Sequence, residues 1–122
     1  MKSLIGAGLL AIAGLTTGTA SHAAWPERPI TLIIPAAPGG TTDIVARLIS
    51  EKLGAALGTT IVIENKAGAA GIIGTQALVR AAPDGYTLIM GNIGPNSINY
   101  SLYKNLPYKA TDFAPISLVI AV

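Results

Sequence analysis

The stretch ITLIIPAAPGGTTDIVARLISEKLGAALG, residues 30–58, decides the fold of this chain. Its first five residues are apolar or β-branched and predict a buried strand. Residues 35–40 contain two prolines and two glycines, which prevent regular structure. From residue 41 apolar side chains recur with helical spacing, and Gly58 stands where glycine commonly ends a helix. The stretch therefore predicts a strand, a loop and an amphipathic helix whose apolar face comprises Val45, Leu48, Ile49, Leu53, Ala56 and Leu57.

The chain then repeats this order of elements. Residues 60–64 predict a second strand, residues 65–71 a loop of small residues, and residues 72–82 a second helix. A third strand is predicted over residues 86–90. Because the apolar runs are continuous rather than alternating, we expect an α/β fold in which helices cover both faces of a parallel sheet through right-handed crossovers.

The last part of the chain has a weaker pattern. Residues 96–103 predict a short helix, residues 104–112 predict irregular structure, and residues 116–122 predict a further apolar strand. Neither a turn nor a polar tail follows this strand. We therefore expect the chain to be a fragment of a longer protein.

The N-terminus has the features of an export signal. A positive start at Lys2 precedes an apolar run, residues 4–15, and then the small residues of segment 16–23. This order predicts a secretory signal peptide over residues 1–23, cleaved after Ala23. An uncleaved membrane anchor is the alternative, but the glycines and the shortness of the run, compared with the roughly 20 residues that span a bilayer, favour the signal peptide.

Composition excludes several classes of function. The chain has 8 Lys and Arg, 6 Asp and Glu, one His and no Cys. This charge is too sparse for a nucleic-acid binder. The single His22 lies in the predicted signal peptide, so the mature chain could form neither a Ser-His-Asp triad nor a His or Cys metal site. The glycines at positions 68, 71 and 74 lack the close first pair of a dinucleotide-binding turn. We therefore expect no enzymatic activity, no metal and no cofactor.

The loops after the first two predicted strands are the candidate site. In an open parallel sheet such loops meet at the carboxyl edge, where ligands bind. Gly39 and Gly40 allow backbone N–H groups to approach a ligand closely, and the following helix presents its positive dipole end. This pattern suits a carboxylate or a phosphate. An ordinary loop, in which Thr42 or Asp43 simply caps the helix, explains the same residues and remains open at this point.

Other polar residues at this edge have weaker signals. Asp43 lacks an acid partner, and a helix N-terminus keeps a carboxylate ionised, so we interpret it as a capping and loop-ordering residue rather than a general base. Gly91 and Asn92 follow the third strand and either add an amide to the site or form only a turn.

Three separated blocks resemble, in order, the start of the substrate-binding receptors of tripartite tricarboxylate transporters, also called Bug receptors. The blocks are WPERPITLIIPAAPGGTTDIVARLISEKLGAALG, residues 25–58; IVIENKAGAAGIIGTQALVRAAPDGYTLIMGNIG, residues 61–94; and INYSLYKNLPYKATDFAPISLV, residues 98–119. The resemblance implies a periplasmic-binding-protein-like fold of type II, with residues 24–122 as the N-terminal lobe, truncated before the second. It also implies capture of a small carboxylate in the periplasm and delivery to integral membrane transporter subunits.

The resemblance also implies which residues face the ligand. In this family, backbone amides of the loops after the first and second strands hold a ligand carboxylate, partly through water. The matching positions here are Pro38, Gly39, Gly40, Thr41, Thr42 and Asp43 in the first loop, and Ala69, Ala70 and Gly71 in the second. Half of a closing cleft should bind weakly, because closure around the ligand supplies affinity.

Two other hypotheses remain open at this point. The chain could belong to an exported α/β enzyme whose catalytic residues lie in a missing C-terminal part, which a downstream cluster of His, Cys or metal ligands would indicate. It could also signal to a membrane sensor kinase instead of serving transport.

Overall fold

The computed structural model describes residues 24–121, and the strands and helices alternate along this part of the chain. The first five main elements are β1 (Ile30–Ile34), α1 (Thr41–Leu57), β2 (Ile61–Asn65), α2 (Ile72–Val79) and β3 (Thr87–Ile89). A 3-10 turn, η1 (Ala69–Gly71), leads into α2; the turn η2 (Gly94–Ile98), the helix α3 (Asn99–Leu102) and the turn η3 (Ala110–Asp112) follow β3. The irregular structure predicted for residues 104–112 is therefore confirmed except for η3.

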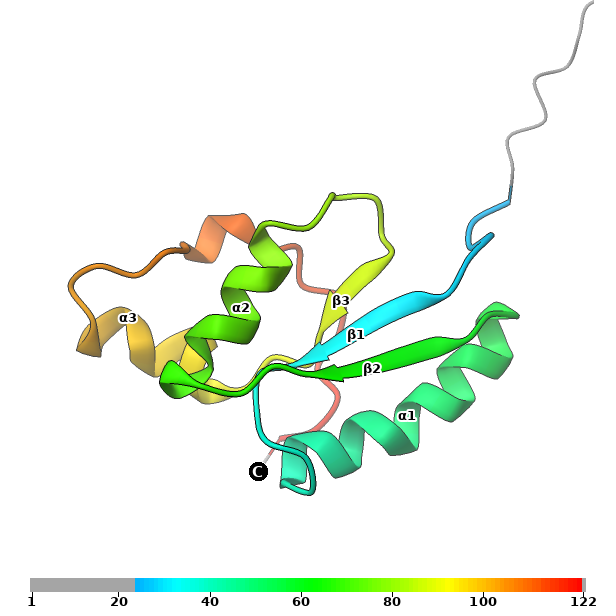
Figure 1. Cartoon of the computed structure of the whole chain (residues 1–122), viewed down its shortest axis with the longest axis horizontal. Helices are drawn as coiled ribbons and strands as arrows, with labels where there is room; N and C mark the ends of the chain where they lie inside the picture. The colour runs from blue at the N-terminus through cyan, green and yellow to red at the C-terminus, as the bar shows by residue number, and fades with distance from the viewer. Residues whose placement is uncertain (1–23, 122) are drawn as a thin grey trace, which may run out of the picture.

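The three strands form one parallel sheet in the order β2-β1-β3. Ile30 lies opposite Ile61 of β2, and Thr31 lies opposite Thr87 of β3. Since the chain crosses from β1 to β2 and then back past β1 to β3, the two crossover helices cover opposite faces: α1 lies on one side of the sheet and α2 on the other (Figure 1). The predicted α/β architecture, with a parallel sheet covered on both faces, is confirmed.

The core lies along the central strand β1. Ile30 and Ile34 are completely buried, and Leu32 packs with Ala46 and Met90. The edge strands β2 and β3 are only partly buried. Half-buried and exposed residues alternate along β2, and the three residues of the short strand β3 are all half-buried. The continuous apolar pattern therefore identifies the central strand most accurately.

Helix α1 packs on the sheet with a face that differs from the predicted one. Val45 and Ile49 pack against the core as expected, but Leu48 is 66% exposed. The buried stripe is rotated toward the small residues Ala46 and Ser50. Small side chains allow a close approach here, since a Cβ at Gly54 would lie 2.8 Å from the carbonyl oxygen of Thr59. The predicted end of the helix is confirmed, because Gly58 adopts the left-handed conformation.

Several predicted boundaries are wrong. Helix α2 ends at Val79 rather than residue 82, because Pro83 disfavours helical backbone before it. The second strand extends to Asn65, which was predicted to lie in the loop. Residues 116–121 form no strand: no backbone hydrogen bond links them to another strand among the described residues, and a strand is stable only within such a ladder.

The predicted signal peptide, residues 1–23, lies outside the described residues, as does Val122. Within residues 24–121, no helix has both the length and the apolar character that crossing a membrane requires.

Candidate functional site

The loops that follow β1, β2 and β3 meet at the carboxyl edge of the sheet. A Cβ at Gly71 would lie 3.0 Å from the Pro95 ring and 3.3 Å from the carbonyl oxygen of Pro35. The loop after β2 is therefore held between the end of β1 and the first turn of η2. This close approach explains why glycine stands at position 71.

The candidate residues divide into three groups around this edge. Pro38, Gly39, Gly40 and Asp43, in the loop before α1 and its first turn, do not line the groove described next. Thr41, Thr42, Gly91 and Asn92 line an open groove of about 1260 Å³ between α1, β3 and the C-terminal segment, residues 112–121. Ala69, Ala70 and Gly71 lie outside this groove and pack toward η2 and α3 instead. The sheet edge thus brings the three loops close together, but their predicted ligand-facing residues do not line one common cavity.

The N-terminus of α1 offers backbone donors. The first helical hydrogen bond joins the N–H of Ile44 to the carbonyl oxygen of Gly40, at 3.0 Å. The N–H groups of Thr41 and Thr42 precede it and have no acceptor within the helix. The N-cap is Gly40 and carries no side-chain cap. The hypothesis that Thr42 or Asp43 is the N-cap is therefore wrong, because both residues lie inside the first turn of α1.

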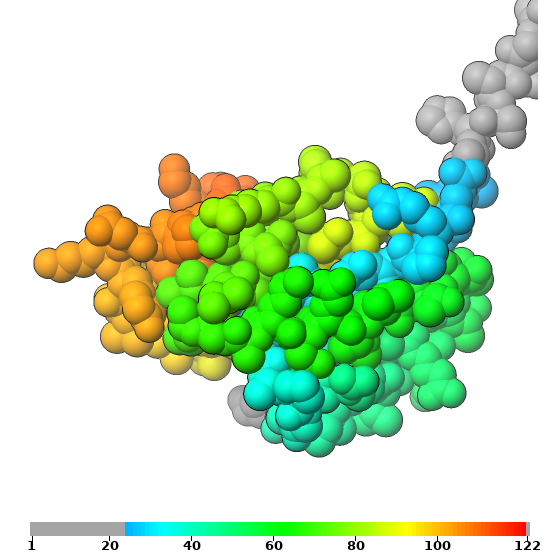
Figure 2. Space-filling view, in the orientation of Figure 1, coloured from blue at the N-terminus to red at the C-terminus, as the bar shows by residue number. Residues whose placement is uncertain are grey.

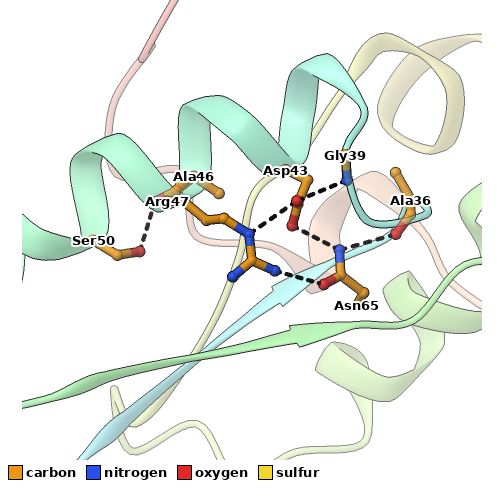
Figure 3. Close-up of polar contacts among 7 residues, drawn as sticks. All are labelled: Ala36, Gly39, Asp43, Ala46, Arg47, Ser50 and Asn65. Atoms are coloured by element: carbon orange, nitrogen blue, oxygen red, sulfur yellow. Dashed lines mark hydrogen bonds and ion pairs between the residues drawn. The ribbon is translucent and has the colours of Figure 1, made fainter.

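Asp43 orders the loop before α1 (Figure 3). Asp43 is 3% exposed, and its Oδ2 accepts hydrogen bonds from the N–H of Gly39 and from Nε of Arg47, both at 2.9 Å. Its Oδ1 accepts a hydrogen bond from Nδ2 of Asn65 at 2.9 Å. The predicted loop-ordering role is confirmed, and both carboxylate oxygens are engaged by the chain itself.

Arg47 and Asn65 complete this network but were missed by the sequence analysis. Arg47 donates from Nη2 to Oδ1 of Asn65 at 3.2 Å, and Nδ2 of Asn65 also donates to the carbonyl oxygen of Ala36 at 3.3 Å. The spacing of Asp43 and Arg47, four residues apart on one helix, is a signal that was available. Asn65 gives no such signal, because its role depends on the pairing of β2 with β1.

The same network perturbs the ionisation of Asp43. The hydrogen bond from Arg47 is the largest cause, and those from Gly39 and Asn65 add to it; together they hold the pKa of the Asp43 carboxyl well below its usual range. Burial opposes this shift but is the weaker influence. Asp43 is therefore an anion at any physiological pH.

This pKa has a consequence for stability. Because folding lowers the pKa of Asp43, its carboxylate contributes stability that is complete above the pKa of the unfolded chain, about 4, and is lost as the pH falls below it. We expect Asp43→Asn to reduce the free energy of unfolding by a constant amount between about pH 5 and pH 8, and by less below about pH 4. Urea unfolding of both proteins across this pH range measures the difference; a gap that widens toward acidic pH would contradict the network.

The loop after β2 has unusual backbone geometry. Residues 68–71 all have positive φ, including two alanines, Ala69 at 46° and Ala70 at 52°. Left-handed backbone costs a non-glycine residue about 1–2 kcal/mol. The buried Asn99 holds this conformation by donating from Nδ2 to the carbonyl oxygen of Ala70 at 3.0 Å. Such strain persists only where neighbouring groups impose it, and it is concentrated at binding sites.

The loop after β3 satisfies its own polar groups. The N–H of Asn92 donates to Oδ1 of Asn96 at 3.2 Å, and Oδ1 of Asn92 accepts a hydrogen bond from the N–H of Gly94 at 3.1 Å. These two bonds engage the backbone N–H and Oδ1 of Asn92, and neither of them uses its Nδ2.

The remaining charges lie on the surface. Arg28 pairs with Asp84, and Lys66 pairs with Glu64, in ion pairs whose side chains are largely exposed. Within residues 24–121, His, Cys, Asp and Glu form no group of three or more that could hold a metal ion. The donors that this edge presents are mainly backbone N–H groups.

Comparison with known proteins finds relatives in sequence and in fold. A family model described as "Tripartite tricarboxylate transporter family receptor" matches residues 45–122. The chain is 42% identical over 119 residues to Protein BugT of Bordetella pertussis. The aligned region covers 91% of this chain and 36% of that protein. Of the solved structures, MatC from Rhodopseudomonas palustris with bound malate has a TM-score of 0.75 and 42% identity, covering 78% of this chain and 33% of that chain. A second R. palustris protein, with adipate, has a TM-score of 0.69 and 38% identity, covering 72% of this chain and 29% of that chain.

The chain spans about a third of the length of the curated relatives it matches. The family match covers well over half of the chain, and the relatives share its sequence and its parallel α/β fold. The chain belongs to the receptor family of the tripartite tricarboxylate transporters.

Proposed function

We propose that residues 24–122 form the N-terminal lobe of an extracytoplasmic receptor that captures a small carboxylate. In this proposal residues 1–23 are a signal peptide that is removed on export to the periplasm. The receptor delivers its ligand to integral membrane subunits of a transporter. The family description supports transport, and no observation favours signalling to a sensor kinase.

The observation that carries this proposal is the N-terminus of α1. Its first N–H groups precede the first helical hydrogen bond, and the positive end of a 17-residue helix favours an anion there. The solved relatives with malate and adipate support a carboxylate as that anion. The residues of the proposed site are Pro38, Gly39, Gly40, Thr41, Thr42, Asp43, Ala69, Ala70, Gly71, Gly91 and Asn92.

These residues have different parts in the proposal. Since the N–H of Gly39 is bound to Asp43, the donors of the first loop are those of Gly40, Thr41 and Thr42. In the loop at η1 the N–H of Gly71 donates to the carbonyl oxygen of Gly68 at 2.9 Å, so the second set of donors is the N–H groups of Ala69 and Ala70. Asp43 supports the first loop and does not itself hold the ligand, because a second carboxylate beside the first would repel it.

Binding rather than catalysis is the proposed activity. The family is a receptor family, and residues 24–121 contain neither His nor Cys to serve as a nucleophile or proton carrier. No residue of the described site favours the alternative of an exported enzyme.

The proposal predicts selective stabilisation of the full-length protein by carboxylates. A ligand at about 100 times its Kd adds about 2.7 kcal/mol, which raises Tm by several degrees. We expect at least one of a panel of mono-, di- and tricarboxylates, including malate and adipate, to produce such a shift in differential scanning fluorimetry. Sugars and purines at equal concentration serve as the comparison. Equal behaviour of all three panels would reject a carboxylate as the ligand.

A further inference from the structure

We propose that Asp43, Arg47 and Asn65 are positioning residues that set the ligand-binding conformation of the loop at residues 38–42. This inference rests on the function proposed above, since it concerns how the same loop is prepared for a carboxylate. None of the three needs to touch the ligand.

The network joins three parts of the fold. Asp43 lies in the first turn of α1, Arg47 one turn later, and Asn65 at the end of β2, where it pairs with Ile34 in the sheet. Asn65 is therefore anchored by strand pairing, and through it the network connects the helix to the sheet. Figure 3 shows the three side chains converging between α1 and β2.

The loop is held at two points. Asn65 donates to the carbonyl oxygen of Ala36, near the end of β1, and Asp43 accepts a hydrogen bond from the N–H of Gly39, the residue before the N-cap Gly40. Figure 2 shows this loop, in cyan, at the surface of the molecule, where a ligand can reach it.

The network also compensates the negative charge of Asp43. Asp43 is an anion within the helix turn that is proposed to bind the ligand's carboxylate, so its charge opposes binding. Arg47 pairs with it at 2.9 Å, and Asn65 donates a hydrogen bond to its other oxygen. The Arg47 side chain is 54% exposed, but the Asp43 side chain is only 4% exposed, so solvent does little to screen the carboxylate without its partners. The helix N-terminus can then attract a second anion.

The lining of the groove at the carboxyl edge of the sheet distinguishes residues that can contact a ligand from those that can only position the loop. Among the described residues it is lined by Thr41 and Thr42 of α1, whereas Asp43, Arg47 and Asn65 do not line it. A ligand in this groove could therefore contact Thr41 and Thr42 but none of the three network residues.

The test is calorimetric titration of the full-length protein with malate and adipate as probes. We expect Arg47→Met and Asn65→Ala each to weaken the binding of whichever probe the wild type binds by on the order of tenfold, because each removes hydrogen bonds that hold the loop. The double variant should bind little more weakly than either single variant, since both act through one network. Arg47→Lys should not restore affinity, because an ammonium group cannot reproduce the two-sided contact of the guanidinium with Asp43 and Asn65.

Two control variants separate positioning from charge and from stability. Arg28→Met removes the same charge from an ion pair of the same length, 2.9 Å to Asp84, and should leave affinity unchanged. Ala46→Gly weakens α1 between Asp43 and Arg47 without touching the network, and should lower Tm but not affinity.

The outcomes distinguish this inference from the proposed function. If the wild type binds none of a wider carboxylate panel, the proposed function fails. If the wild type binds and Arg47→Met and Asn65→Ala bind within about twofold of it, only the positioning role fails. Restoration by Arg47→Lys would show that a positive charge suffices without the two-sided guanidinium contact, and an equal loss in Ala46→Gly would show a purely structural effect; either result overturns the inference.

Discussion

Gly74→Ala is expected to lower the free energy of unfolding by about 2 kcal/mol. A Cβ at this position in α2 would lie 2.8 Å from the carbonyl oxygen of Lys66 and 2.9 Å from Cα of Pro35. Both obstacles are backbone atoms, so α2 would have to move away from the end of β1. The higher helix propensity of alanine returns about 1 kcal/mol, which is less than the cost of three contacts at or below 3.0 Å.

Urea unfolding of Gly74→Ala beside Gly40→Ala measures this effect. A Cβ at Gly40 would meet only the carbonyl oxygen of Ala37, at an ordinary 3.6 Å, and φ there is −78°. The control should therefore lose less than about 1 kcal/mol, the cost of a poorer N-cap residue. If Gly74→Ala is as stable as the wild type, the close packing of α2 on β1 is wrong.

Asn99→Ala is expected to cost about 2–3 kcal/mol. Asn99 is 1% exposed, and its Nδ2 donates to the carbonyl oxygen of Ala70 and, at 3.3 Å, to Oη of Tyr108. The variant removes both hydrogen bonds and leaves the buried hydroxyl of Tyr108 without this donor. It also releases the strained backbone of Ala70, so the full-length protein should bind its carboxylate more weakly as well.

Asn96→Ala is the matched control for this prediction. Asn96 lies three residues earlier in the same helical segment, and its Oδ1 accepts an exposed hydrogen bond from Asn92 at 3.2 Å. Loss of an exposed hydrogen bond should cost no more than about 1 kcal/mol. Thermal unfolding of both variants measures the two losses of stability. Equal losses would show that Asn99 has no special role in holding η1.

The architecture could be predicted because its strands and helices are specified by residues that are neighbours in the sequence. The apolar run of β1 and the glycine at position 58 each specify their element through neighbouring residues alone. Leu48 shows where this reasoning fails: its spacing suits an apolar face, but the close approach of α1 to β2 at Gly54 selects a different stripe for burial. The segment at residues 116–121 has the composition of a strand, yet a strand also needs a paired neighbour.

The candidate site was predictable in part for the same reason. The glycines at 39 and 40 and the acidic residue at 43 are local signals, and the structure confirms the loop-ordering role of Asp43. Asn65 was missed because its amide reaches Ala36 and Asp43, residues far away in the sequence, only after β2 pairs with β1. Periodicity carries no information about such contacts.

The most direct measurement is an amide titration of the full-length, ¹⁵N-labelled protein with the carboxylate that stabilises it most. If backbone groups of the two loops hold that carboxylate, the largest resonance shifts will be those of Gly40, Thr41 and Thr42 and of Ala69 and Ala70 in η1. The Gly39 amide, bound to Asp43, will move less. Binding that leaves both loops unshifted while other residues respond would contradict a site at the carboxyl edge of the sheet.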